Sequence, residues 1–137
     1  MSGDRAPATP PPADGSPPGW AWQPVCESAR LVERGAGLRF AWSGHGRADW
    51  PAFVVRADGR PSAFLNRCAH VPVELDGEPG RFFDDAGLYL VCATHGACYD
   101  AATGVCVAGP CRGKRLSALD AIEHDGQVWI LMNLETR

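Results

Sequence analysis

Residues 66–70 read Asn-Arg-Cys-Ala-His, and residues 92–96 read Cys-Ala-Thr-His-Gly. Each stretch contains one cysteine followed closely by one histidine, so each offers one thiolate and one imidazole. Each also follows a segment with the composition of a β-strand, which would let a rigid sheet aim the two loops at one centre. The candidate metal ligands are therefore Cys68, His70, Cys92 and His95.

The order of the four ligands narrows the kind of metal centre. A zinc finger of the common kind places both cysteines before both histidines, whereas here each loop has one of each. One cysteine and one histidine per loop is what a two-iron cluster with mixed ligation requires, with two thiolates on one iron and two imidazoles on the other. A structural zinc site is the alternative, and colour separates the two because zinc is colourless and the cluster is brown.

Length and composition indicate one folded domain behind a polar leader. The chain has 137 residues, and residues 1–18 contain almost no large apolar side chain but many prolines. We expect residues 1–18 to be disordered and residues 19–137 to form the domain.

Charge and hydropathy exclude several classes of protein. The net charge is −3 without a basic block, which argues against nucleic-acid binding. The longest strongly apolar run, residues 88–93, is too short for a membrane span, and the first residues do not resemble a secretory signal. We therefore expect a cytoplasmic protein with reduced thiols, in which six cysteines favour metal binding over disulfides.

Strand signals dominate the rest of the chain. Short apolar segments alternate with turns such as Asp58-Gly59 and residues 124–126, and only residues 71–77 could form a short turn of helix. This pattern predicts an all-β fold, an antiparallel β sandwich or partly open barrel. We expect residues 34–37 to form a hairpin turn and His45 and His124 to lie in surface turns. The expected strands cover residues 30–33, 38–42, 51–56, 62–66, 81–83, 87–91, 98–100, 105–107, 116–122 and 127–131.

The two ligand stretches, together with Thr103-Gly104 and Gly109-Pro110, resemble a Rieske iron–sulfur domain over roughly residues 25–132. The resemblance implies one [2Fe-2S] cluster per chain, bound in a small cluster-binding subdomain. It implies that Cys68 and Cys92 bind the inner iron and that His70 and His95 bind the outer iron. It also implies that the segment around Pro110 shields a third side of the cluster.

Two features separate the chain from the high-potential respiratory type, and one is shared with it. Val73 and Thr94 stand where that type has a disulfide between the ligand loops, and Ala97 stands where it has a serine that donates to a bridging sulfide. Tyr99 matches a tyrosine whose hydroxyl bonds a ligand thiolate. We expect a reduction potential in the lower half of the range of about −150 to +300 mV.

Three further cysteines, Cys98, Cys106 and Cys111, lie near the second ligand stretch. The alternatives are a second metal site and a Cys106–Cys111 disulfide. We expect all three to be small buried apolar side chains.

The resemblance implies an electron carrier of ferredoxin type rather than an enzyme. Its partners would be a flavin reductase and a terminal oxygenase or other oxidoreductase, docking through an apolar rim of Val71, Pro72 and residues 109–110. A catalytic oxygenase needs a second iron site with two histidines and a carboxylate, but only His124 follows His95. The alternative is a Rieske-type small subunit of a larger reductase, such as a nitrite reductase.

Overall fold

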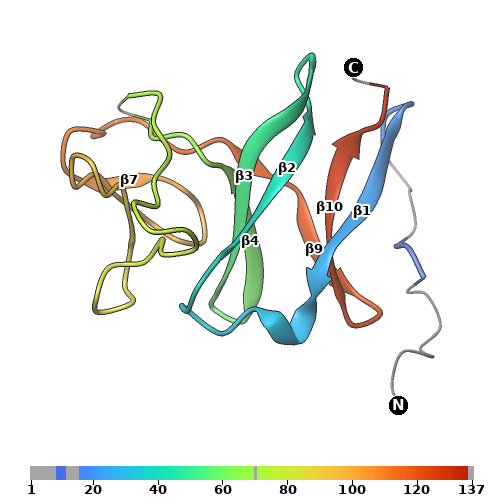
Figure 1. The fold of residues 1–137 in the computed structure, drawn as a ribbon, viewed down its shortest axis with the longest axis horizontal. Helices are drawn as coiled ribbons and strands as arrows, with labels where there is room; N and C mark the ends of the chain where they lie inside the picture. The colour runs from blue at the N-terminus through green and yellow to red at the C-terminus, as the bar shows by residue number, and fades with distance from the viewer. Residues whose placement is uncertain (1–8, 12–15, 70, 136–137) are drawn as a thin grey trace.

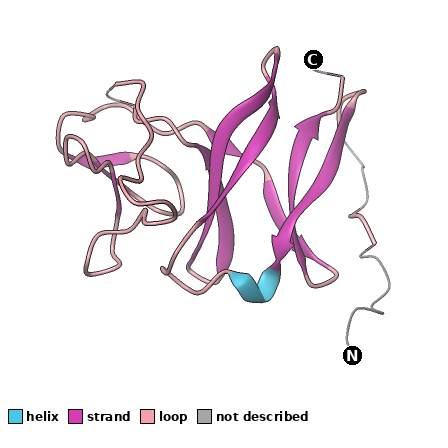
Figure 2. Cartoon of the chain, in the orientation of Figure 1, coloured by secondary structure: helices cyan, strands magenta, loops and turns pink. Residues whose placement is uncertain are grey.

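The computed structural model describes residues 9–11, 16–69 and 71–135 and shows an almost entirely β architecture (Figures 1 and 2). The all-β prediction is confirmed. Most of the segment expected to be disordered, residues 1–18, lies outside the described residues. The strands are β1 (Trp20–Glu27), β2 (Leu38–Gly44), β3 (Arg47–Ala57), β4 (Arg60–Leu65), β5 (Leu90–Val91), β6 (Cys98–Tyr99), β7 (Cys106–Ala108), β8 (Ala118–Leu119), β9 (Ala121–His124) and β10 (Gln127–Asn133), with one 3-10 helix, η1 (Ser28–Arg30).

The described strands form three antiparallel sheets. Their orders are β1-β10-β9, β2-β3-β4-β8 and β5-β6-β7. In Figure 1 the second sheet stands between the first sheet and a loop-rich lobe that contains β7. We call this lobe, residues 66–116, the cluster lobe. No helix in the described part of the chain is long and apolar enough to cross a membrane.

Strand β3 is the wall shared by two hydrophobic cores. Ala52 and Val54 face the core between the first two sheets, whereas Phe53 and Val55 face the core of the cluster lobe. Side chains alternate between the faces of a strand, so a strand covered on both faces is apolar throughout. The Phe53 ring stacks on Phe82 of the cluster lobe, with 3.9 Å between ring centroids.

The segment expected to be one strand, residues 116–122, divides at Asp120. Before it, β8 pairs with β4 of the second sheet, and after it, β9 pairs with β10 of the first sheet. The Asp120 carbonyl accepts a hydrogen bond from the Leu131 amide at 3.1 Å. A bend at this point lets one segment join both sheets, as happens at the corners of β sandwiches.

The prediction of a hairpin turn at residues 34–37 is wrong. The Arg34 amide instead donates to the Arg56 carbonyl, and β2 pairs with β3 through a turn at His45-Gly46. Both turn residues have positive φ, at 50° and 76°, as a two-residue hairpin turn requires. The strand expected at 30–33 is replaced by η1 and an isolated bridge between Glu33 and Arg56.

Two other local predictions are also wrong. Residues 71–77 form bends rather than a turn of helix. The Val73 carbonyl accepts a hydrogen bond from the Cys68 amide, which precedes this segment, instead of a bond within a helical turn. The strand expected at residues 81–83 is reduced to one isolated antiparallel β-bridge, between Phe83 and Leu90.

Candidate metal centre

The two candidate ligand loops follow the ends of strands, as expected. The first ligand loop contains Cys68, and the second ligand loop contains Cys92 and His95. Strand β4 ends at Leu65, just before Cys68, and β5 ends at Val91, directly before Cys92. Both sulfur-bearing residues are buried, with exposed fractions of 3% and 0%, while His95 is exposed. The fourth predicted ligand, His70, lies outside the described residues.

A buried polar pair, Asn66 and Asp76, holds the first ligand loop. The Asn66 side chain donates to Asp76 Oδ1 at 3.0 Å and accepts from the Leu75 amide at 2.9 Å. Asp76 Oδ2 accepts from the Gly80 amide at 2.9 Å and lies 3.6 Å from Arg39 Nε. Sequence reasoning did not recognise this pair; its one signal was the position of Asn66 within the first motif. Because each buried polar group has a partner, the loop can be rigid.

Backbone hydrogen bonds shape the second ligand loop and join it to the first. The Cys92 amide donates to the Ala97 carbonyl, and the Gly96 amide returns to the Cys92 carbonyl, both at 2.8 Å. The Ala93 amide donates to the Leu75 carbonyl of the first loop at 2.9 Å. The two cysteines are therefore held by one continuous network.

The Cys68 thiol opposes ionisation of the Cys92 thiol. Burial raises the pKa of the Cys92 thiol, and its hydrogen bond with Cys68 and the charge of that group act in the same direction. Hydrogen bonds from the Thr94 and His95 amides lower the pKa of Cys92. Two adjacent buried thiols with amide donors fit a cationic iron centre, which would displace the thiol protons and balance the charge of the resulting thiolates.

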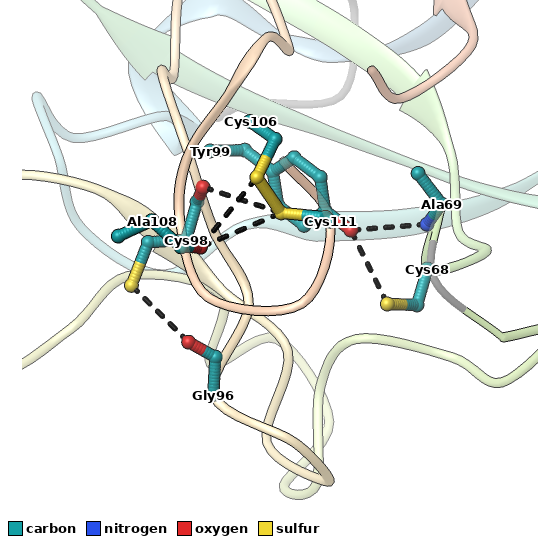
Figure 3. The surroundings of a disulfide bond; sticks show 8 residues. All are labelled: Cys68, Ala69, Gly96, Cys98, Tyr99, Cys106, Ala108 and Cys111. Atoms are coloured by element: carbon teal, nitrogen blue, oxygen red, sulfur yellow. Dashed lines mark hydrogen bonds between the residues drawn. A yellow bond between two sulfur atoms is a disulfide. The ribbon is translucent and has the colours of Figure 1, made fainter. Parts of the chain in front are cut away.

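The Tyr99 hydroxyl supports the first thiol, as predicted (Figure 3). Its oxygen lies 3.2 Å from Cys68 Sγ and accepts from the Ala69 amide at 3.0 Å. Burial, followed by the hydrogen bond with Cys68, raises the pKa of Tyr99, so the phenol keeps its proton. When Cys68 is a thiolate it has no proton to give, and Tyr99 must then be the donor.

Cys106 and Cys111 form a disulfide, so the prediction of two free apolar side chains is wrong (Figure 3). Both are buried as expected, but burial cannot show that the loop between them brings their sulfurs together. Both sulfurs lie 3.5 Å from the Ala108 carbonyl oxygen. A disulfide sulfur carries no hydrogen, so these are contacts rather than hydrogen bonds. Cys98 is a half-buried free thiol, 3.4 Å from the Gly96 carbonyl.

The other two histidines are apart from this centre in the fold. His45 is exposed in the β2–β3 turn and touches Trp42, with 5.0 Å between ring centroids. His124 ends β9 and is half-buried rather than fully at the surface. Among residues 9–11, 16–69 and 71–135, no three side chains of His, Cys, Asp and Glu come together as a metal site.

The family model for the Rieske [2Fe-2S] domain matches residues 21–127. The chain belongs to the Rieske family. A Rieske domain carries one [2Fe-2S] cluster per chain, and the paired thiols of the second and first ligand loops fit that cofactor. No curated protein sequence matches the chain significantly.

Solved structures of carbazole 1,9a-dioxygenase components share this fold. The ferredoxin of carbazole 1,9a-dioxygenase from Nocardioides aromaticivorans IC177 is 24% identical with a TM-score of 0.61, over 80% of this chain and 95% of that chain. The terminal oxygenase of carbazole 1,9a-dioxygenase from Novosphingobium sp. KA1 is 22% identical with a TM-score of 0.64, over 80% of this chain and 29% of that chain. A chain from the reduced complex between oxygenase and ferredoxin in carbazole 1,9a-dioxygenase is 22% identical with a TM-score of 0.64, over 80% of this chain and 27% of that chain. This chain thus spans less than a third of those two longer chains, and the likenesses concern the fold.

Proposed function

We propose that this Rieske protein is an electron carrier of ferredoxin type whose cluster is held by Cys68, His70, Cys92 and His95. The observation that supports the proposal most strongly is the pair of buried thiols, Cys68 and Cys92, held together by the network of the two loops. When bound, the cluster takes up and releases one electron. Two thiolates neutralise its oxidised core, and neutral imidazoles leave the reduced form less anionic than four thiolates would.

The described residues divide the proposed ligands into an inner and an outer side. The thiols lie inside the lobe, whereas His95 is exposed and so offers a short path to a partner. Pro72 and Pro110 are also exposed, which agrees with an apolar docking rim that includes the half-buried Val71. Redox partners dock through small, transient interfaces of this kind.

We propose a flavin reductase as the electron donor and a terminal oxygenase or another oxidoreductase as the acceptor. Support comes from the ferredoxin of carbazole 1,9a-dioxygenase, nearly all of which this chain matches, although below 25% identity. We propose no catalytic reaction for the chain itself. The cytoplasmic location and the domain boundary at residue 19 stay predictions.

Electron paramagnetic resonance of the dithionite-reduced protein tests the ligand set. We expect a two-iron spectrum with a mean g value below that of an all-cysteine cluster. His70→Ala and His95→Ala should each abolish this spectrum, while the matched controls His45→Ala and His124→Ala should keep it. A colourless protein that binds zinc and gives no spectrum would contradict the proposal.

Electron transfer needs its own test. Catalytic amounts of the protein should accelerate the reduction of cytochrome c by NADH and a flavin reductase, and the two ligand variants should not. A stable complex with a large reductase in native lysate would instead favour the subunit alternative.

A further inference from the structure

The Cys106–Cys111 disulfide closes a short loop at the side of the proposed cluster site. Strand β7 begins at Cys106 and pairs with β6, and the chain then turns through Gly109 and Pro110 back to Cys111. Beyond the bridge, the Lys114 amide donates to the Cys111 carbonyl at 2.8 Å. The bridge and these backbone bonds fix both ends of the loop, which we call the bridged loop, residues 106–111.

The bridged loop packs directly against the second ligand loop. Gly109 has φ +91°, and a Cβ atom there would lie 3.0 Å from Ala97 Cα and 3.1 Å from the Gly96 carbonyl oxygen. Only glycine allows this backbone approach at this φ. Gly109 thus packs against Gly96 and Ala97. The backbone groups of these two residues form hydrogen bonds with the carbonyl and the amide of Cys92, respectively.

A chain of direct contacts therefore joins the disulfide to a proposed ligand. The bridge fixes the loop, Gly109 of the loop covers Gly96 and Ala97, and these two hold the backbone of Cys92. The sulfur of Cys111 also lies 3.8 Å from the Cys98 carbonyl, next to the same segment. Cys111 is fully buried, so the bridge belongs to the lobe's core rather than to its surface.

We propose that Cys106 and Cys111 are positioning residues for the cluster: their disulfide holds the bridged loop against the second ligand loop and so fixes the surroundings of Cys92. The proposal rests on the proposed ligand set. It assigns a role to two cysteines that bind no iron themselves. Partners behind the ligands of a metal commonly determine its retention and electronic properties.

The first test is the double variant Cys106→Ser/Cys111→Ser. A serine hydroxyl can still donate to the nearby Ala108 carbonyl, so the covalent link is the main loss. We expect the visible absorbance of the holoprotein to decay about tenfold faster in excess EDTA. The reduced spectrum should also shift its g values, which a purely structural contribution to stability would not cause. Cys26→Ser, at a free half-buried cysteine of β1, is the matched control and should change neither.

A second variant, Gly109→Ala, leaves the disulfide intact and forces the bridged loop away from Ala97. It should shift the spectrum in the same way, and it decides the matter if the double variant does not fold. The proposal is overturned if both variants keep the wild-type spectrum and decay rate. It is also overturned if alkylation and mass spectrometry find Cys106 and Cys111 as free thiols in the isolated holoprotein. A wild-type protein without a two-iron spectrum would instead defeat the proposed function.

Discussion

At the scale of single residues, Tyr99 joins both sides of the first ligand loop. Its oxygen accepts from the Ala69 amide, and its proton is directed at the Cys68 sulfur once that sulfur is a thiolate. A donor to a ligand sulfur stabilises the reduced cluster more than the oxidised one, because the reduced cluster carries one more negative charge. We therefore expect the hydroxyl of Tyr99 to affect the reduction potential as well as the loop.

Tyr99→Phe should lower the reduction potential. If the lost hydrogen bond is stronger by about 1.4 kcal/mol in the reduced state, the one-electron potential falls by about 60 mV. A redox titration followed by visible spectroscopy measures the change. Tyr89→Phe, at a tyrosine exposed by 40%, is the matched control and should leave the potential unaltered. An equal or higher potential in Tyr99→Phe would show that the hydroxyl does not stabilise the reduced state.

At the scale of secondary-structure elements, the sequence predicted the strands that have strong local signals. Asp58-Gly59 marks the β3–β4 turn correctly, and its two residues have positive φ at 56° and 78°. Strand β1 was missed because Pro24 interrupts it. A proline is tolerated in an edge strand, and β1 is an edge strand with an irregularity between Pro24 and Cys26.

The surroundings of the candidate site were less predictable than its two cysteines. The motif spacing selected Cys68 and Cys92, which are buried and adjacent in the fold, but the supporting contacts depend on residues that approach only in the folded chain. Asp76 lies ten residues from its partner Asn66, and nothing in the local sequence pairs them. The Cys106–Cys111 bridge likewise depends on how the loop turns after β7, which short-range patterns do not determine.

Another element-scale contact joins the second sheet to the first. Arg56 of β3 binds Glu123 of β9 through two hydrogen bonds of 2.7 and 2.9 Å. The same guanidinium donates to the Leu31 carbonyl at 2.7 Å and the Ser28 carbonyl at 3.0 Å. The side chains of Arg56 and Glu123 are 15% and 32% exposed, so solvent screens the pair only partly.

The Arg56–Glu123 pair should make the stability of the protein depend on pH. The hydrogen bond from Arg56 holds the pKa of Glu123 below its ordinary value of 4.5. Because the folded-state pKa is lowered, the stabilisation is complete above pH 4.5 and is lost as the pH falls through the folded-state pKa. Glu123→Gln should therefore cost about 1 kcal/mol of unfolding free energy at pH 7 and progressively less below pH 4.5.

Urea denaturation of both proteins at a series of pH values measures this difference. Asp85→Asn is the control, because the Arg81–Asp85 pair is 60% and 91% exposed and should contribute little. A cost of Glu123→Gln that stays constant from pH 7 to pH 3 would show that the charge of Glu123 is not what stabilises the fold.

At the scale of the whole molecule, two hydrophobic cores share β3. The sandwich core lies between the first two sheets and includes residues of β10. The other core belongs to the cluster lobe. The lobe is also attached at a second point, where Arg34 donates to the carbonyls of Gly87 and Leu88 at 3.2 and 3.0 Å. The lobe thus depends on the sandwich for one of its walls, while the sandwich core is complete without the lobe.

This asymmetry predicts different consequences for neighbouring substitutions in β3. Phe53 and Val54 are both 0% exposed but point into different cores. Phe53→Leu removes the stack on Phe82 and Val54→Ala removes two methyl carbons, each at a cost of about 1.5 kcal/mol. We expect Phe53→Leu to lower the temperature at which the visible absorbance of the cluster is lost by more than it lowers the far-ultraviolet circular dichroism transition. Val54→Ala should lower the second transition at least as much as the first. If each variant shifts both signals equally, the two cores unfold as one cooperative unit, and the lobe cannot open while the sandwich stays folded.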